Sequence, residues 1–218
     1  AMGGAGLHRA LFARMNRDGV TAPARIAFAD HTRLVRRMHS TMYGAFFFSM
    51  AIAVALPQLN AMAMEYVRHA FSEGGLGYVG DAYRSGNVLR AAAATWANNY
   101  LMQTLLLTIV ISVVIPCAGL LKTFASFVLA GIGMAPIASG MAAQYTFHSI
   151  TMMLELEAYI YACAAVVIFW SKLLSALRQR SLGPAIEGLR LLGSASVLTG
   201  IMLAIAGLYE AATLILLR

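Results

Sequence analysis

The sequence predicts an all-α protein, a polytopic bundle of about five membrane-spanning helices with its N-terminus in the cytoplasm. Of its 218 residues, 60% are hydrophobic and only 11% are charged, a balance that soluble domains do not have. Apolar runs of about 20 residues, the length that a helix needs to cross a bilayer, recur along the chain. Lys and Arg gather in alternate connecting segments, as the positive-inside rule requires.

The expected spans follow from the apolar runs. Pro57 predicts a kink in the first span, and Pro116 lies near the end of the second. Lys122 and residues 116–119 alone separate the second span from the third, so this pair is either a tight hairpin or a re-entrant pair. The expected spans are residues 42–64, 100–121, 123–143, 149–170 and 191–217.

The charges divide the chain into two parts. Residues 1–41 hold seven Arg and two Asp and are predicted to form a basic, amphipathic cytoplasmic segment, with helical spacing in LHRALFARMNRD and ARIAFADHTRLVRRMH. Residues 42–218 are the predicted transmembrane domain, with an extracytoplasmic loop at 65–97. A second basic loop, 171–190, is expected on the cytoplasmic side.

The basic segment has two interpretations. Basic patches are typical of nucleic-acid-binding proteins, but beside a membrane span they favour contact with anionic lipid, and no nucleic-acid partner is expected. The candidate residues for binding the membrane surface or a partner protein are Arg33, Arg36 and Arg37.

Less regular features are predicted between the spans. The Gly-rich stretch SEGGLGYVGDAYRSGN should be irregular, and NVLRAAAATWANN should form a short helix with Trp96 and Tyr100 as interface anchors. Cys117 and Cys163 lie in apolar runs and are expected to be buried and free of disulfides. Gly131 and Gly133 predict close approach between helices.

Three glutamates, Glu155, Glu157 and Glu210, lie inside apolar runs. Inserting a carboxylate at bilayer depth costs at least ~2.5 kcal/mol, so each should be paired or functional. Helical spacing puts His148, Glu155 and Tyr159 on one stripe and Glu157 on the opposite face, which excludes a dyad within one helix.

Two roles for these acids remain open. They form an ion or proton relay with His148 as its entry, or they fix helix packing through hydrogen bonds to neighbouring helices, which is the favoured reading. His148 has no second ligand at a useful spacing, so no metal or cofactor is expected. Asn98 and Asn99 are interpreted as helix-capping and interface hydrogen-bonding residues at the start of the second span. No nucleotide-binding or hydrolase motif is present, and no enzymatic activity is expected.

Four segments carry a resemblance to a known family. WANNYLMQTLLL, SFVLAGIG, LELEAYIYACAAVV and AGLYEAATLILL occur in an order that resembles the stage II sporulation protein M family of bacterial membrane proteins, over residues 96–217. The resemblance places Glu155 and Glu210 on the family's two helix glutamates and Asn98 or Asn99 on its Asn position. The chain departs from the family at residues 150–152, where a Pro-His-Gly triplet is usual, and at Glu157, where Pro is usual.

This resemblance implies a function. The chain is expected to be a multi-pass protein of the bacterial cytoplasmic (inner) membrane that assembles or anchors a membrane complex, as the founding member holds peptidoglycan-degrading proteins at the membrane. Expected partners are membrane lipid and other membrane or extracytoplasmic proteins, with an ATPase or a second copy of the chain as further candidates. The alternative is a permease-like subunit of an ABC-type or ion-coupled transporter that uses the three glutamates.

Overall fold

A computed structural model describes residues 19–137 and 142–216, and side chains for 19–137 and 148–216. Within these ranges every regular element is helical and no strand occurs, which confirms the all-α prediction. The elements are α2 (Ala22–Asp30), α3 (Thr32–Ala55), α4 (Pro57–Ser72), α5 (Gly77–Arg84), α6 (Val88–Trp96), the π-helix η1 (Ala97–Val110), α7 (Ile111–Val114), α8 (Ala118–Gly133), α9 (Ala142–Gln179) and α10 (Gly183–Leu216).

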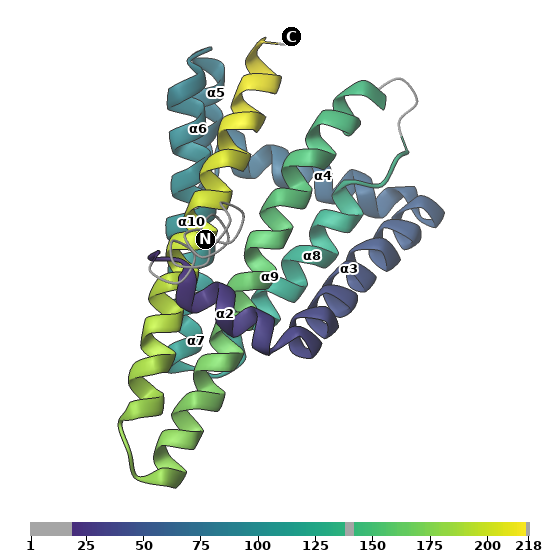
Figure 1. Ribbon diagram of the computed structural model, residues 1–218. Helices are drawn as coiled ribbons and strands as arrows, with labels where there is room; N and C mark the ends of the chain where they lie inside the picture. Colours follow the sequence, from purple (N-terminus) through teal and green to yellow (C-terminus); the bar gives the residue numbers. More distant parts are fainter. Residues whose placement is uncertain (1–18, 138–141, 217–218) are drawn as a thin grey trace, which may run out of the picture.

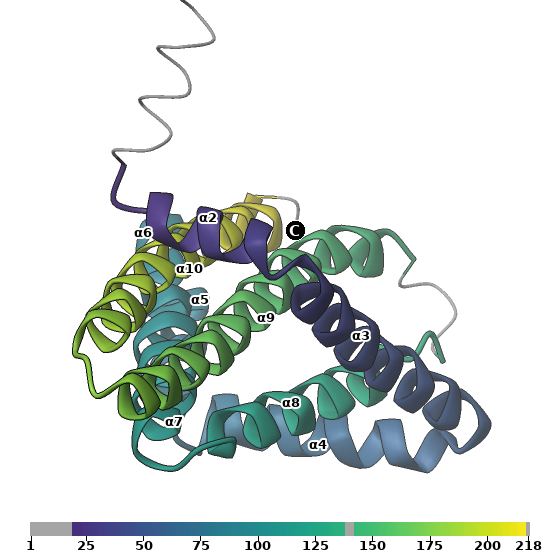
Figure 2. The ribbon, with the colours of Figure 1, turned by 60° about the horizontal axis from the view of Figure 1, so that its bottom comes forward.

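The bundle is organised around α9 and α10, which form a long antiparallel hairpin (Figure 1). Helices α3 and α8 pack against each other and against α9, while α6 and η1 run along α10. The short helix α2 crosses the hairpin (Figure 2) and packs on α10, where its Ala24 amide donates to the Ser194 hydroxyl at 3.0 Å. Each of the four longest helical segments therefore belongs to the α9–α10 hairpin or contacts it, while α4 packs on α3, α5 and α8.

Among the described residues, four helical segments are long and apolar enough to cross a membrane, which makes the chain a membrane protein. They are Thr32–Ala55, Val88–Val114, His148–Gln179 and Gly183–Leu216. The expected third span corresponds to α8, which has only 16 residues. At 1.5 Å per residue α8 is about 24 Å long, short of the ~30 Å hydrocarbon layer.

The first span begins and ends earlier than its apolar run predicts. Pro57 does not kink it: α3 ends at Ala55, and Pro57 is the first residue of a separate helix, α4. Proline disfavours helical angles in the residue before it, and Leu56 has φ −127° and ψ 77°. Because α3 starts at Thr32, residues 32–41 belong to the first spanning helix, and Arg33, Arg36 and Arg37 are exposed on its first turns.

The Gly-rich stretch before the second span is not irregular, contrary to its composition. It contains α5, which packs on α4 at a position where a Cβ on Gly80 would overlap the Phe71 carbonyl oxygen. The following helix, α6, continues directly into η1 and α7, so the second span covers Val88–Val114 rather than 100–121 and ends before Pro116.

The 171–190 segment is a helical hairpin tip rather than a loop. Helix α9 continues to Gln179, and α10 begins at Gly183. Across this tip the Lys172 ammonium donates to Glu187 at 2.8 Å. Each helix is longer than a bilayer requires, which is why an apolar-run criterion places both ends of α9 and the start of α10 inside the true helix ends.

Three smaller expectations have mixed outcomes. The helix predicted in ARIAFADHTRLVRRMH is present as α2 and the start of α3, with a break at His31, while LHRALFARMNRD lies outside the described residues. Cys163 is buried as expected, but Cys117 is exposed in the turn before α8, with a left-handed φ of 68°.

Glycine sets the distance between α8 and its neighbours. A Cβ at Gly131 would overlap the Phe46 carbonyl oxygen and the Ser49 hydroxyl of α3. At Gly119 it would overlap the Thr108 carbonyl oxygen of η1. Gly133, by contrast, has open space around its Cβ position. The predicted close approach is therefore confirmed at Gly131 and is wrong at Gly133.

We expect Gly131→Ala to destabilise the bundle, because α3 and α8 must separate to admit the methyl group. Overpacking of this kind costs ~1–3 kcal/mol. The control is Gly44→Ala, in a helix interior with nothing within 4 Å of its Cβ position, where alanine should be neutral or stabilising by ~0.5–1 kcal/mol. Thermal unfolding in detergent measures both, and equal midpoints for the two variants would contradict this account of α8 packing.

The positive-inside rule predicts that the turn after α4 and the α9–α10 tip lie on opposite sides of the membrane, which requires that the short helix α8 carries the chain across the bilayer between the second and third of the four longer spans. With Cys117 and Cys163 replaced by Ala, a cysteine at Glu73 should react with an impermeant maleimide added to sealed cells, and a cysteine at Arg178 should react only after permeabilisation. Both native side chains are exposed, so burial would not protect either position. Labelling of both from outside would contradict the orientation.

Candidate functional site

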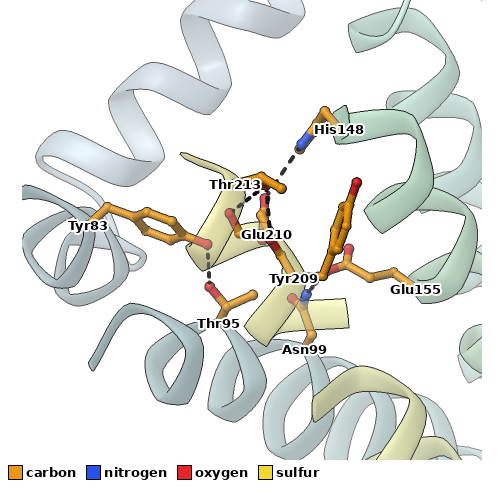
Figure 3. A network of polar contacts seen from close by, with 8 residues as sticks. All are labelled: Tyr83, Thr95, Asn99, His148, Glu155, Tyr209, Glu210 and Thr213. Carbon is orange, nitrogen blue, oxygen red and sulfur yellow. Dashed lines mark hydrogen bonds and ion pairs between the residues drawn. The ribbon is translucent and has the colours of Figure 1, made fainter. Parts of the chain in front are cut away.

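Two of the three intramembrane carboxylates belong to one cluster of polar side chains, which we call the carboxylate network (Figure 3). It lies between α9, α10 and the α5–α6–η1 segment. Its acids are Glu155 of α9 and Glu210 of α10, which are close enough to interact electrostatically. The network consists of Tyr83, Thr95, Asn99, His148, Glu155, Tyr209, Glu210 and Thr213.

Glu155 pairs with Asn99. The Asn99 side-chain amide donates to a Glu155 carboxylate oxygen at 2.6 Å. The Asn98 side-chain amide in turn donates to the Asn99 side-chain oxygen at 2.9 Å. The two asparagines lie within the second span, nine or more residues after its start at Val88. The predicted capping role is therefore wrong, while both asparagines do make side-chain hydrogen bonds, and that of Asn99 joins η1 to α9.

The π-helical geometry of η1 places Asn99 at this contact. A π-helix has wider turns than an α-helix and is frequent at functional sites. Thr104 donates its hydroxyl to the Asn99 carbonyl oxygen at 2.7 Å, and Thr108 donates to that of Gln103 at 2.8 Å, each over a five-residue step. The sequence indicates this geometry. The polar residues Asn99, Thr104 and Thr108 are spaced five and four residues apart, whereas residues on one face of an α-helix are spaced four and three apart.

Glu210 pairs with His148, whose Nδ1 lies 3.6 Å from a Glu210 carboxylate oxygen. The Glu210 side chain is only 16% exposed. On α5, outside the spans, the Tyr83 hydroxyl lies 3.1 Å from the Thr95 hydroxyl. Burial and the neighbouring Glu210 carboxylate raise the pKa of Tyr83 above its ordinary value, so this phenol stays protonated and able to donate at neutral pH.

Glu157 lies apart from this network, as its predicted position on the opposite face requires. It contacts α3, where the His39 imidazole lies 2.8 Å from one carboxylate oxygen and the Tyr43 hydroxyl donates to the other at 2.9 Å. Sequence analysis missed His39 and Tyr43. Their four-residue spacing on a helix was the available signal, since it puts two hydrogen-bonding groups on one face.

Tyr159, predicted on the Glu155 stripe, lies close enough to Glu155 and Glu210 to interact electrostatically with both. Its ring lies 5.7 Å from the ammonium of Lys122, a cation–π contact between α9 and α8. The same ammonium donates to the Gln103 carbonyl oxygen of η1 at 3.4 Å. Tyr159 thus helps to accommodate a lysine inside the bundle.

The chemistry of these groups is that of interhelical pairing. Among the described residues no cluster of three or more His, Cys, Asp or Glu side chains could hold a metal ion. Each carboxylate instead faces a hydrogen-bonding or ion-pairing side chain from another helix. No family model, curated protein or solved structure matches the chain.

We expect Glu155→Gln to keep the bundle intact, because a glutamine oxygen still accepts from Asn99. Glu155→Leu should lower the free energy of unfolding, since it leaves the Asn99 amide without its acceptor. Interhelical hydrogen bonds in membranes average ~0.6 kcal/mol and reach ~1.7 kcal/mol, so the loss should fall in that range. Unfolding in mixed micelles measures it.

The matched control is Glu65→Gln on α4, where the carboxylate pairs with Arg68 and both side chains are about 70% exposed (68% and 71%). It should leave stability unchanged, because exposed ion pairs contribute little. A Glu155→Gln protein as unstable as Glu155→Leu would show that the negative charge, rather than the hydrogen bond, is what the fold requires.

Proposed function

We propose that this chain is a non-enzymatic protein of the bacterial inner membrane that assembles or anchors a membrane complex, as its resemblance to the stage II sporulation protein M family implies. One observation carries the proposal. The three intramembrane carboxylates each pair with a side chain on a different helix: Glu155 with η1, Glu157 with α3 and Glu210 with α9. Such pairing holds the bundle in one arrangement.

A fixed arrangement suits a protein that presents surfaces to partners. One surface is the exposed side of α4. Met62 and Tyr66 are 68% and 65% exposed there, beside the charged side chains of Glu65 and Arg68. Aromatic, Met and Arg side chains are enriched where proteins bind each other. On the expected extracytoplasmic side, this mixture fits a protein partner rather than lipid.

The permease-like alternative has its own supporting observation at the opposite end. The α9–α10 tip exposes Leu177 and Leu182 (67% and 77%) beside Arg178 and Arg180. An apolar and basic helical tip facing the cytoplasm would suit the docking of an ATPase. Glu155 and Glu210, neighbours in the carboxylate network, would then supply two acids for ion coupling.

Partner capture distinguishes the two functions. We expect the tagged protein, solubilised from its native membranes, to copurify with an extracytoplasmic protein identified by mass spectrometry. The double variant Met62→Asp, Tyr66→Ala on α4 should reduce that recovery at least about tenfold, as the loss of central interface side chains does elsewhere. The corresponding change on the tip, Leu177→Asp with Leu182→Asp, should leave it unchanged.

The permease reading predicts the reverse pattern, in which the tip variant loses a cytoplasmic ATPase and the α4 variant loses nothing. That result would overturn the scaffold proposal. The conservative variant Met62→Leu is the control for α4, because it keeps an apolar side chain of similar size. Unfolding midpoints equal to that of the parent protein would exclude misfolding as the cause of any loss.

A further inference from the structure

A second polar cluster, His39, Tyr43 and Glu157, joins α3 to α9 away from the carboxylate network. The Nδ1 atom of His39 lies 2.8 Å from the Val35 carbonyl oxygen, and its Nε2 atom lies 2.8 Å from a Glu157 carboxylate oxygen. The Tyr43 hydroxyl donates to the other Glu157 oxygen at 2.9 Å. Both oxygens of the acid are therefore engaged by α3.

These contacts fix the number of protons in the cluster. A carbonyl oxygen can only accept, so Nδ1 of His39 carries a hydrogen. Nε2 and the facing carboxylate oxygen can form a hydrogen bond only if one further proton lies between them. The pair is then either imidazolium with carboxylate or neutral imidazole with carboxylic acid, and each form holds that one proton.

We propose that His39, Tyr43 and Glu157 form a proton-binding site, and that the bound proton joins α3 to α9. Without the proton, the lone pair of Nε2 would face a carboxylate oxygen at 2.8 Å, which is repulsive. With a second proton the carboxylate charge is lost, and with it the attraction between the imidazolium and an opposite charge. The contact is therefore strongest with one proton bound.

The surroundings of the site are largely aromatic. Tyr161 of α9 is a further titratable side chain that faces the site, with its ring centroid 5.9 Å from that of His39. From the neighbouring helices come the apolar rings of Phe28 on α2, 5.1 Å from Tyr161, and Phe127 on α8, 5.9 Å from Tyr43. An apolar surround of this kind makes the state of the single proton matter more to the contact.

The site is less buried than the carboxylate network. The side chains of His39 and Glu157 are 26% and 31% exposed, more than the 16% of Glu210. His39 follows the basic residues Arg36 and Arg37 on the same helix, so the positive-inside rule puts it toward the cytoplasmic side. Histidine is the side chain suited to binding and releasing a proton near neutral pH. A proton that reaches the site would then come from the cytoplasmic side, whichever partner the protein binds.

A double-mutant cycle tests the proposal on the full-length protein in lipid nanodiscs. Unfolding midpoints of the parent, His39→Gln, Glu157→Gln and the double variant would give the coupling between the two side chains. We expect the coupling at about pH 6.5 to fall by at least half at about pH 9.5, where histidine is normally neutral. A coupling that is the same at both pH values would overturn the proposal and leave a proton-independent hydrogen bond.

The exposed pair His69 and Glu73 on α4, 64% and 77% exposed, provides the control cycle and should show little coupling at either pH. A second measurement does not depend on the variants folding. In the parent protein with ¹⁵N-labelled histidine, the Nδ1 signal of His39 should remain that of a protonated nitrogen, while its Nε2 signal changes because the proton shared with Glu157 is lost between about pH 5.5 and about pH 9.5. An Nε2 signal that does not change over this range would also overturn the proposal.

Discussion

The pairing of carboxylates at bilayer depth is the constraint on which the bundle depends. In hydrocarbon an unpaired acid is costly, and no water is present to satisfy it. Helix α9 carries two acids on opposite faces, Glu155 and Glu157, and meets the third, Glu210, through His148. Each acid requires a partner from another helix, so η1, α3 and α10 are all positioned relative to α9.

Backbone carbonyl groups inside the membrane also need hydrogen-bond donors, and other parts of the bundle supply them. The π-helix η1 departs from regular α-helical bonding, and the hydroxyls of Thr104 and Thr108 bind its carbonyl groups. Trp170 of α9 donates its indole N–H to the Ser112 carbonyl oxygen at 2.7 Å, where the span ends. Irregular backbone is tolerated at membrane depth where neighbouring protein groups bind it.

The fold class could be predicted because apolar length and helical period are local properties of the sequence. The same period placed Glu155 and Glu157 on opposite faces, and their different partners confirm it. Helix ends could not be predicted in this way: α9 and α10 continue past the apolar run as polar helix, and α5 forms within a Gly-rich stretch because Gly80 allows close packing on α4.

The residues that pair with the acids could not be predicted from the sequence, for a different reason. Glu155 is 56 residues from Asn99, and Glu157 is 118 residues from His39. Only the tertiary arrangement brings such groups together, and the π-helix shifts Asn99 from the face that an α-helical count would give it. His39 was assigned to a tail because the apolar run starts after it, although α3 already begins at Thr32.

Because Glu155 and Glu157 lie on opposite faces of α9, the contact with η1 and the contact with α3 can change separately. One acid holds η1 and the other holds α3, each through different side chains. A change of proton occupancy at Glu157 would therefore loosen α3 while Glu155 still holds η1 to α9. A scaffold built this way could adjust its cytoplasmic side and keep the arrangement of helices that supports its outer surface.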